Sequence, residues 1–153
     1  MKSLPMKAWL SIVALLASCI ITSAWAESAI KSTPLLKSTT TTIGDKIEYL
    51  QTNKPEVTSL IIQLEPGAET GWHKHPVPTY AYVQTGNLTV DMQDRSRHEF
   101  SAGTAFVEVM NTWHNGKNFG KTPVTILVFY SGEEGRSNVI WPDKEAIINP
   151  SSK

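Results

Sequence analysis

The stretch that decides the fold is residues 67–86, GAETGWHKHPVPTYAYVQTG. It places His73 and His75 two residues apart, and side chains at this spacing on a strand project from the same face. Two imidazoles on one face can share a metal ion, although a solvent-exposed His-x-His pair has the same sequence. Pro76 and Pro78 then interrupt regular ladder pairing. Taken alone, the histidine pair is a weak indication of a metal site.

A second stretch, residues 103–118, adds a third histidine and reads GTAFVEVMNTWHNGKN. Together the two stretches resemble the two motifs of the cupin family, Gly-x5-His-x-His-x3-Glu-x6-Gly and Gly-x5-Pro-x-Gly-x2-His-x3-Asn. The positions in register are Gly67, His73, His75, Gly86, Gly103, His114 and Asn118. The resemblance implies an all-β jelly-roll barrel, a double-stranded β-helix, with the metal held by His73, His75 and His114.

The chain departs from both motifs in ways that matter differently. Thr79 stands where the first motif has its Glu, usually the fourth protein ligand of the family. A threonine hydroxyl is neutral and a poor ligand, so this change is expected to affect the chemistry of the metal site. Val109 and Asn111 replace the Pro and Gly of the second motif. Asparagine tolerates positive φ, so the change at Asn111 is expected to be structural.

The three histidines also predict a metal site on chemical grounds. Three neutral imidazoles resemble the ligand set of a catalytic zinc, with positions left open for water or substrate. Imidazole suits iron, copper and nickel as well. The expected cofactor is one divalent metal ion, and the sequence does not distinguish iron, manganese, zinc, nickel and copper.

No acidic residue is an obvious partner for this site. Glu108, six residues before His114, is the nearest carboxylate and the candidate catalytic residue. The favoured interpretation is nevertheless an outward strand residue in a surface pair, because charged residues are mostly exposed. The same interpretation applies to Glu69. His98 follows the polar residues 95–97 and is expected to be solvated.

The rest of the chain predicts short strands separated by turn residues, a pattern typical of a sandwich or barrel. A hairpin is expected over Thr85-Gly86-Asn87. The run at 124–130, VTILVFY, is expected to be buried on both faces. Strands are predicted at 47–50, 57–64, 79–84, 88–92, 98–100, 104–109, 124–130 and 139–141, with a weak helix candidate at 143–148.

The first 26 residues have the features of a signal peptide. Lys2 and Lys7 precede an apolar run that is too short to favour a spanning helix. Ala24-Trp25-Ala26 then offers small residues at the −3 and −1 positions before Glu27. The expected location is therefore the periplasm or the outside of the cell. The expected organisation is a signal peptide at 1–26, an N-terminal arm at 27–45, a cupin barrel at 46–142 and a C-terminal tail at 143–153.

A lipoprotein is the alternative. Leu16-Ala17-Ser18-Cys19 resembles a lipoprotein signal, in which a lipidated Cys19 would be the mature N-terminus. The apolar Ile20 and Ile21 that follow disfavour it. Cys19 is also the only cysteine, so a disulfide framework is excluded.

Charge and composition limit the partners. Lys and Arg total 14, as do Asp and Glu, so the chain has no basic footprint for nucleic acid. The expected partner is a small molecule, and an anionic one is favoured if Glu108 lies away from the metal. Two functions are expected: an enzyme, which would be a metal-dependent oxygenase, isomerase or lyase, or alternatively a non-catalytic binding or sensing module. The arm around residues 35–43 could add a strand to a partner, which would give a homodimer.

Overall fold

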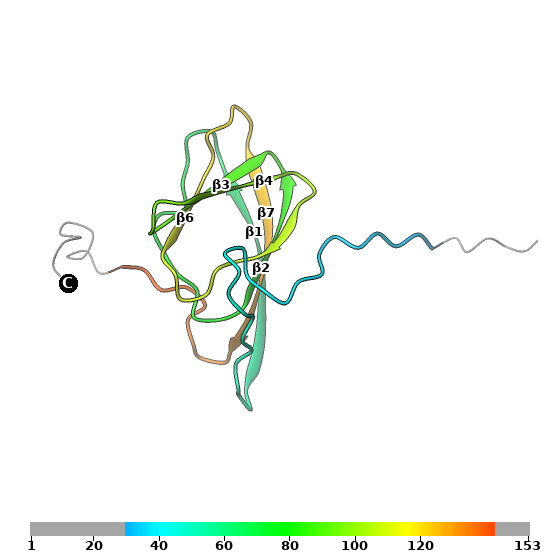
Figure 1. The fold of residues 1–153 in the computed structure, drawn as a ribbon, viewed down its shortest axis with the longest axis vertical. Helices are drawn as coiled ribbons and strands as arrows, with labels where there is room; N and C mark the ends of the chain where they lie inside the picture. Colours follow the sequence, from blue (N-terminus) through cyan, green and yellow to red (C-terminus); the bar gives the residue numbers. More distant parts are fainter. Residues whose placement is uncertain (1–29, 143–153) are drawn as a thin grey trace, which may run out of the picture. The chain divides into compact units, whose positions relative to one another are not determined.

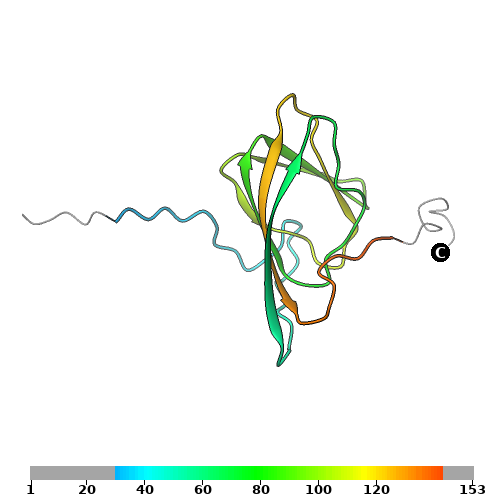
Figure 2. The same cartoon turned by 180° about the vertical axis from the view of Figure 1, so that it is seen from behind.

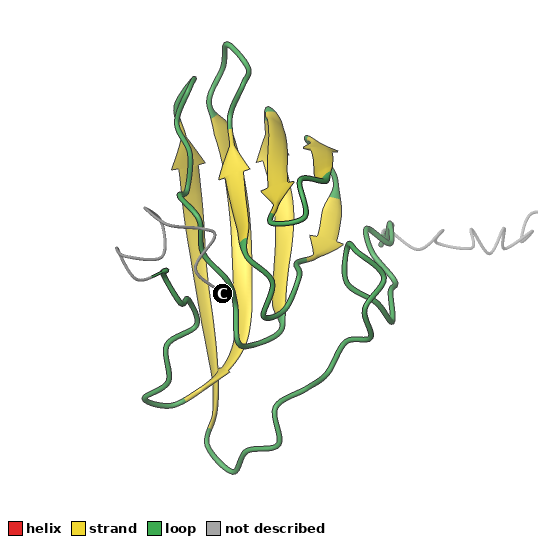
Figure 3. Ribbon diagram, turned by 60° about the vertical axis from the view of Figure 1, so that its left-hand side comes forward, coloured by secondary structure: helices red, strands yellow, loops and turns green. Residues whose placement is uncertain are grey.

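The computed structural model describes residues 30–142, and the regular elements within them are all β-strands (Figures 1 and 3). The described residues from Pro34 to 142 belong to one compact unit. In chain order the strands are β1 (Pro55–Leu64), β2 (Thr79–Thr85), β3 (Asn87–Met92), β4 (Arg97–Ser101), β5 (Ala105–Val107), β6 (His114–Lys117) and β7 (Val124–Glu133). Within residues 30–142 no helix is long and apolar enough to cross a membrane.

The strands form two antiparallel sheets. One has the order β1-β7-β2-β5 and the other the order β4-β3-β6. Figures 1 and 2 show the strands from the front and from behind. One apolar core draws side chains from both sheets, among them Val83 and Val128 from the first and Leu88 and Val90 from the second. The predicted all-β, jelly-roll class is confirmed.

Alternation along β7 sets which side chains face this core. Val124, Ile126, Val128 and Tyr130 are buried, and each pairs with an alternate residue of β1. The residues between them lie on the other face, where Phe129 is 42% exposed. The expectation that this strand is buried on both faces is wrong, because the described residues place no second layer over the outer face of its sheet.

Several predicted elements differ from the structure. The run at 47–50 is not a strand, and 139–141 contributes a single bridge between Ile140 and Lys74. The strand β6 was not predicted, because its sequence, HNGK, is polar and contains glycine. The weak helix candidate at 143–148, the C-terminal tail at 143–153 and the signal peptide lie outside the described residues.

Part of the predicted N-terminal arm packs against the barrel in its own chain. The backbone N–H and the side-chain hydroxyl of Thr42 both donate to the carbonyl of Val107, at 2.9 and 2.8 Å. Thr41 N–H donates to the carbonyl of Asp45, which closes a turn between the bridged residues Thr40 and Lys46. These contacts extend the β5 edge of the four-stranded sheet within one chain.

The junction at Gly86 carries the chain from one sheet to the other. The strands on either side, β2 and β3, belong to different sheets, so the predicted hairpin is wrong. Gly86 has φ +77°, and a Cβ added there would lie 2.8 Å from the Pro123 carbonyl oxygen and 2.8 Å from Val124 Cγ2. The close approach of the chain before β7, together with the left-handed backbone, requires glycine at this position.

We expect Gly86→Ala to lower the free energy of unfolding by about 2–6 kcal/mol, since left-handed backbone strain and overpacking cost roughly 1–3 kcal/mol each. Gly103→Ala is the matched control, because Gly103 has φ +88° but no atom lies within 4 Å of the position that a Cβ would take. It should show the backbone cost alone. Urea denaturation of the two variants measures the difference, and equal losses would contradict the packing argument.

Candidate metal centre

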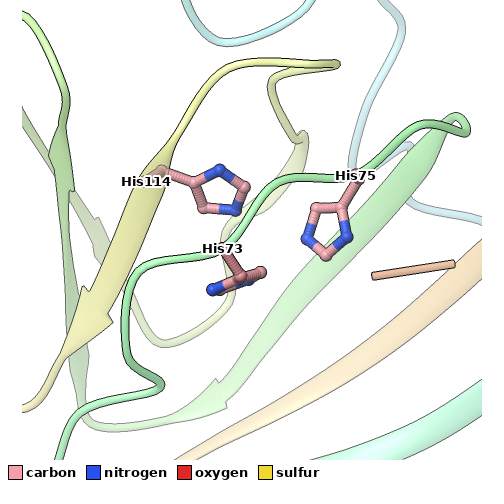
Figure 4. Close-up of side chains that lie close together, drawn as sticks. All are labelled: His73, His75 and His114. Atoms are coloured by element: carbon pink, nitrogen blue, oxygen red, sulfur yellow. The ribbon is translucent and has the colours of Figure 1, made fainter. Parts of the chain in front are cut away.

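Two extended segments bring the three histidines together (Figure 4). His73 and His75 lie between β1 and β2, and His114 begins β6. His73 and His114 form an antiparallel bridge in which each N–H donates to the other's carbonyl at 2.9 Å. His75 bridges Met110, and its carbonyl accepts the N–H of Asn111 at 2.8 Å. The backbone around residues 110–114 therefore fixes all three histidines.

The side chains of His73, His75 and His114 converge as a metal site requires. Their ring centroids lie 4.4–5.0 Å apart. Each ring can offer one nitrogen, and these nitrogens all lie within 4.8 Å of one another. Alternation of side chains works as the sequence predicts, because Lys74 between them places its Nζ 4.8 Å from the Trp113 ring centroid instead.

Backbone carbonyls set the tautomer of all three rings. Nδ1 of His73 lies 2.8 Å from the carbonyl oxygen of Gly71. Nδ1 of His75 lies 3.0 Å from that of Asn138, and Nδ1 of His114 lies 2.9 Å from that of Thr112. A carbonyl oxygen only accepts, so each Nδ1 carries a proton and each neutral ring keeps a lone pair on Nε2. Metal-binding histidines are typically oriented in this way.

Glu108 joins the histidines, contrary to the favoured sequence interpretation. Its Oε2 lies 3.3 Å from Nε2 of His75 and 3.2 Å from Nε2 of His114, and its side chain is 16% exposed. Strand register is the reason. Tyr80 pairs with Val107, and Glu108 N–H donates to the Thr79 carbonyl at 2.9 Å, so Glu108 lies opposite Thr79 on the inner face of the sheet. The expectation of an outward surface residue is wrong.

The charges of these groups depend on one another. Burial by itself would raise the pKa of Glu108, but His114 and His75 hold that pKa well below its usual range. Burial lowers the pKa of His73 to about 4. Burial also opposes a charge on His75, but the hydrogen bond and negative charge of Glu108 outweigh it and raise the pKa of His75. Glu108 is therefore ionised at neutral pH.

The donor set fits a metal ion. Nε2 of His114 is buried and makes no hydrogen bond, even though the Glu108 carboxylate lies 3.2 Å away. An orphaned buried nitrogen is costly unless something binds it. Neighbouring ligands of a tetrahedral ion with bonds of 2.0–2.1 Å lie about 3.3 Å apart. The distances from Glu108 to His75 and His114 are close to this separation.

A small cavity lies beside the histidines. The space open to the centre of a water molecule measures about 30 Å³, room for about two waters. Its polar lining includes Thr70 and Tyr130 as well as the histidines and Glu108. Burial and the negative charge of Glu108 raise the pKa of Tyr130 to about 12, so its hydroxyl stays protonated. The apolar lining consists of Ile62, Leu88, Val90, Phe106, Ile126 and Val128.

The segment after β7 supports the site, a role that the sequence did not predict. Its Asn138 carbonyl accepts from His75, and Ile140 exchanges two backbone hydrogen bonds with Lys74, at 3.0 and 2.9 Å. The Trp141 ring lies 5.4 Å from the His73 ring. No sequence motif predicts these contacts, because they join residues that lie far apart in the chain.

Other motif residues have structural roles. Asn118 is buried, donates to the carbonyls of Leu64 and Thr122, and accepts the N–H of Gly120, so it fixes the turn before β7. Asn111 has φ +53°, which confirms the expected positive φ.

Two further polar residues lie outside the metal centre. Glu69 is a surface residue as expected, with a side chain 54% exposed beside Lys117. The expectation for His98 is wrong, because its Nε2 is buried and without a hydrogen-bond partner.

A comparison with known protein families identifies the family that this barrel matches. Residues 60–130 match the family described as Cupin domain. These residues form a cupin domain. The resemblance of the histidine motifs to the cupin motifs is thereby confirmed, and both motif histidine segments fall within the matched residues. No curated protein matches the chain.

Two solved enzyme structures resemble the chain in fold. The DMSP lyase DddQ from Ruegeria pomeroyi is 13% identical with a TM-score of 0.50, over 67% of this chain and 47% of that one. Oxalate decarboxylase from Lactobacillus farciminis, in a formate complex, is 18% identical with a TM-score of 0.51, over 63% of this chain and 31% of that one. The chain thus spans less than half the length of either enzyme, and the likeness concerns the fold alone.

Proposed function

We propose that this cupin binds one divalent metal ion through His73, His75 and His114 and uses it to hold a small organic molecule. The observation that carries the proposal is the set of three backbone hydrogen bonds that leave three Nε2 lone pairs facing a common space. A bound divalent ion would supply Lewis-acid chemistry toward an oxygen of the ligand. The orphaned Nε2 of His114 supports the same proposal.

The chain's own residues define what such a ligand meets. The protonated hydroxyl of Tyr130 can donate a hydrogen bond, and Thr70 offers a second hydroxyl at the cavity wall. The apolar side chains of β1, β3 and β7 exclude water from the rest of the space. The ligand that fits has a few non-hydrogen atoms, one oxygen directed toward the histidines and an otherwise apolar surface.

The sequence argument for an anionic ligand assumed that Glu108 lies away from the histidines. Its carboxylate is instead 3.2–3.3 Å from two of them. A divalent ion with neutral imidazoles and this carboxylate would leave a net charge of about +1 instead of +2. The preference for anions is therefore weaker than the sequence argument suggested, and neutral oxygen ligands compete.

An enzyme and a binding module are the two forms of this proposal. A metal-dependent oxygenase, isomerase or lyase requires open metal positions and a proton donor or acceptor near the ligand. Tyr130 and Glu108 are the candidates for proton transfer among the described residues that line the cavity. A binding or sensing module requires the cavity alone. In either form the cavity volume of about 30 Å³ limits the bound molecule to a small one.

Export and self-association complete the proposal. The features of residues 1–26 support delivery to the periplasm or the outside of the cell, with a lipoprotein anchored through Cys19 as the alternative. The outer face of the four-stranded sheet supports a homodimer, because Val57 is 72% exposed, Ile61 64% and Phe129 42%. Exposed apolar residues gathered on one face are typical of protein interfaces.

Replacing any one of the three histidines with alanine should lower metal affinity by at least about 10–100-fold, the loss that removal of outer-shell partners already causes. The fold should survive, since the apolar core lies in the two sheets. Calorimetric titration with Zn²⁺ and elemental analysis measure the effect. His98→Ala is the matched control and should bind metal normally. Full metal occupancy in all three site variants would contradict the proposal.

Protein recovered from the native envelope should begin at Glu27, because Ala24-Trp25-Ala26 is the predicted cleavage motif. N-terminal sequencing measures this directly. A lipidated Cys19 at the N-terminus would replace soluble export by the lipoprotein alternative. An intact Met1 on cytoplasmic protein would contradict both.

A further inference from the structure

We propose that Glu108 is the acidic ligand of the metal centre and supplies, from the position directly after β5, the carboxylate that Thr79 lacks. This inference rests on the proposed metal site and deepens it, because it assigns a fourth protein ligand. The carboxylate comes from a different point in the sequence than the first histidine motif predicts, and strand register is what brings it there.

Three adjacent strands place Thr79 and Glu108 at the same point of the inner face. Thr79 pairs with Tyr130 of β7, whose side chain lines the cavity. On its other side, the Thr79 carbonyl accepts the Glu108 N–H at 2.9 Å. Paired residues of neighbouring strands project from the same face of a sheet. A carboxylate on Glu108 therefore reaches the space that a longer acidic side chain at Thr79 would enter.

Thr79 itself is directed to another partner. Its Oγ1 donates to the carbonyl of Val77 at 3.1 Å, and the residue is fully buried. The hydroxyl thus satisfies a backbone acceptor two residues earlier in the chain. With Thr79 occupied in this way, Glu108 is the carboxylate that contacts the histidines among the described residues.

The position of Glu108 relative to the imidazole rings distinguishes a ligand from an orienting partner. An orienting carboxylate accepts a proton from the ring nitrogen that faces away from the metal. In this site that nitrogen, Nδ1, is already bonded to a backbone carbonyl in all three histidines. Glu108 instead lies on the Nε2 side, 3.3 Å from His75 and 3.2 Å from His114.

Electrostatics then favours a cation between these atoms. When both rings are neutral, the Glu108 Oε2 atom and the Nε2 lone pairs of His75 and His114, 3.3 and 3.2 Å from it, repel, because all three atoms are acceptors. A proton on one ring relieves one of these contacts, whereas a divalent cation shared by the three atoms relieves them all. Together the three histidines and Glu108 would complete the shell of a tetrahedral ion, whereas a six-coordinate ion held by them would have two further positions for water or a small ligand.

A chemical consequence follows for any reaction at the site. A carboxylate bound to the metal is not free to act as a general base. Proton transfer to or from a ligand would then depend on Tyr130, whose hydroxyl lines the same cavity. Glu108 is accordingly assigned to metal binding and not to proton transfer.

The test is Glu108→Gln, which keeps the side-chain shape and removes the charge. We expect the affinity for Co²⁺ to fall by at least about 10–100-fold, the loss typical of outer-shell changes. We also expect the visible absorption spectrum of bound Co²⁺ to change, because water replaces the lost carboxylate. Glu69→Gln is the matched control, since its carboxylate pairs with Lys117 at the surface and should leave both readouts unchanged.

A second variant separates a ligand from a structural residue. In Thr79→Glu/Glu108→Ala the carboxylate moves to the paired strand while the space occupied by Glu108 is vacated. A ligand role predicts that most of the lost Co²⁺ affinity returns, whereas a structural role of Glu108 would not be restored by an acid at residue 79.

The inference is overturned if Glu108→Gln binds Co²⁺ with unchanged affinity and an unchanged spectrum while the histidine variants lose the metal. That outcome leaves the three-histidine proposal standing. Metal retention in the histidine variants is the separate result that removes the proposed function itself.

Discussion

The candidate site depends on three hydrogen bonds from histidine Nδ1 atoms to backbone carbonyls. The acceptors are Gly71, Thr112 and Asn138, which lie before the first histidine, before the last, and after β7. Because each acceptor is a carbonyl, each bond fixes both the ring orientation and the tautomer. Three segments far apart in sequence must therefore keep their relative positions for the Nε2 lone pairs to converge. The bridges from His73 to His114 and from Lys74 to Ile140 provide that constraint.

The register with which β2 pairs with β5 and β7 also determines which residues reach the metal centre. It aligns Thr79 with Tyr130 on one side and with Glu108 on the other. A shift of one residue would turn Glu108 to the outer face, where charged strand residues usually lie. Gly86 directly follows β2, and its backbone packs closely against Pro123 and Val124, which helps to hold this register. Backbone pairing thus decides which acid the histidines meet.

Much of the fold and part of the site followed from the sequence. Glycine and histidine spacing predicted the family, the barrel and the three histidines. The positive φ of Asn111 followed from residue chemistry. The contact between Glu108 and the histidines did not, because exposure statistics favour an outward acid and only cross-strand register reverses them. The roles of Asn138 and Trp141 were also missed, since they depend on a long-range contact after β7 and no local pattern marks it.

The most direct test is anomalous diffraction from crystals of the protein purified without added metal. Data collected at absorption edges both locate and identify a bound ion. The account predicts one anomalous peak per chain, within bonding distance of Nε2 of His73, His75 and His114 and of a carboxylate oxygen of Glu108. An ordered structure in which these nitrogens bind only water, with no anomalous peak even after soaking with Zn²⁺ or Mn²⁺, would contradict it.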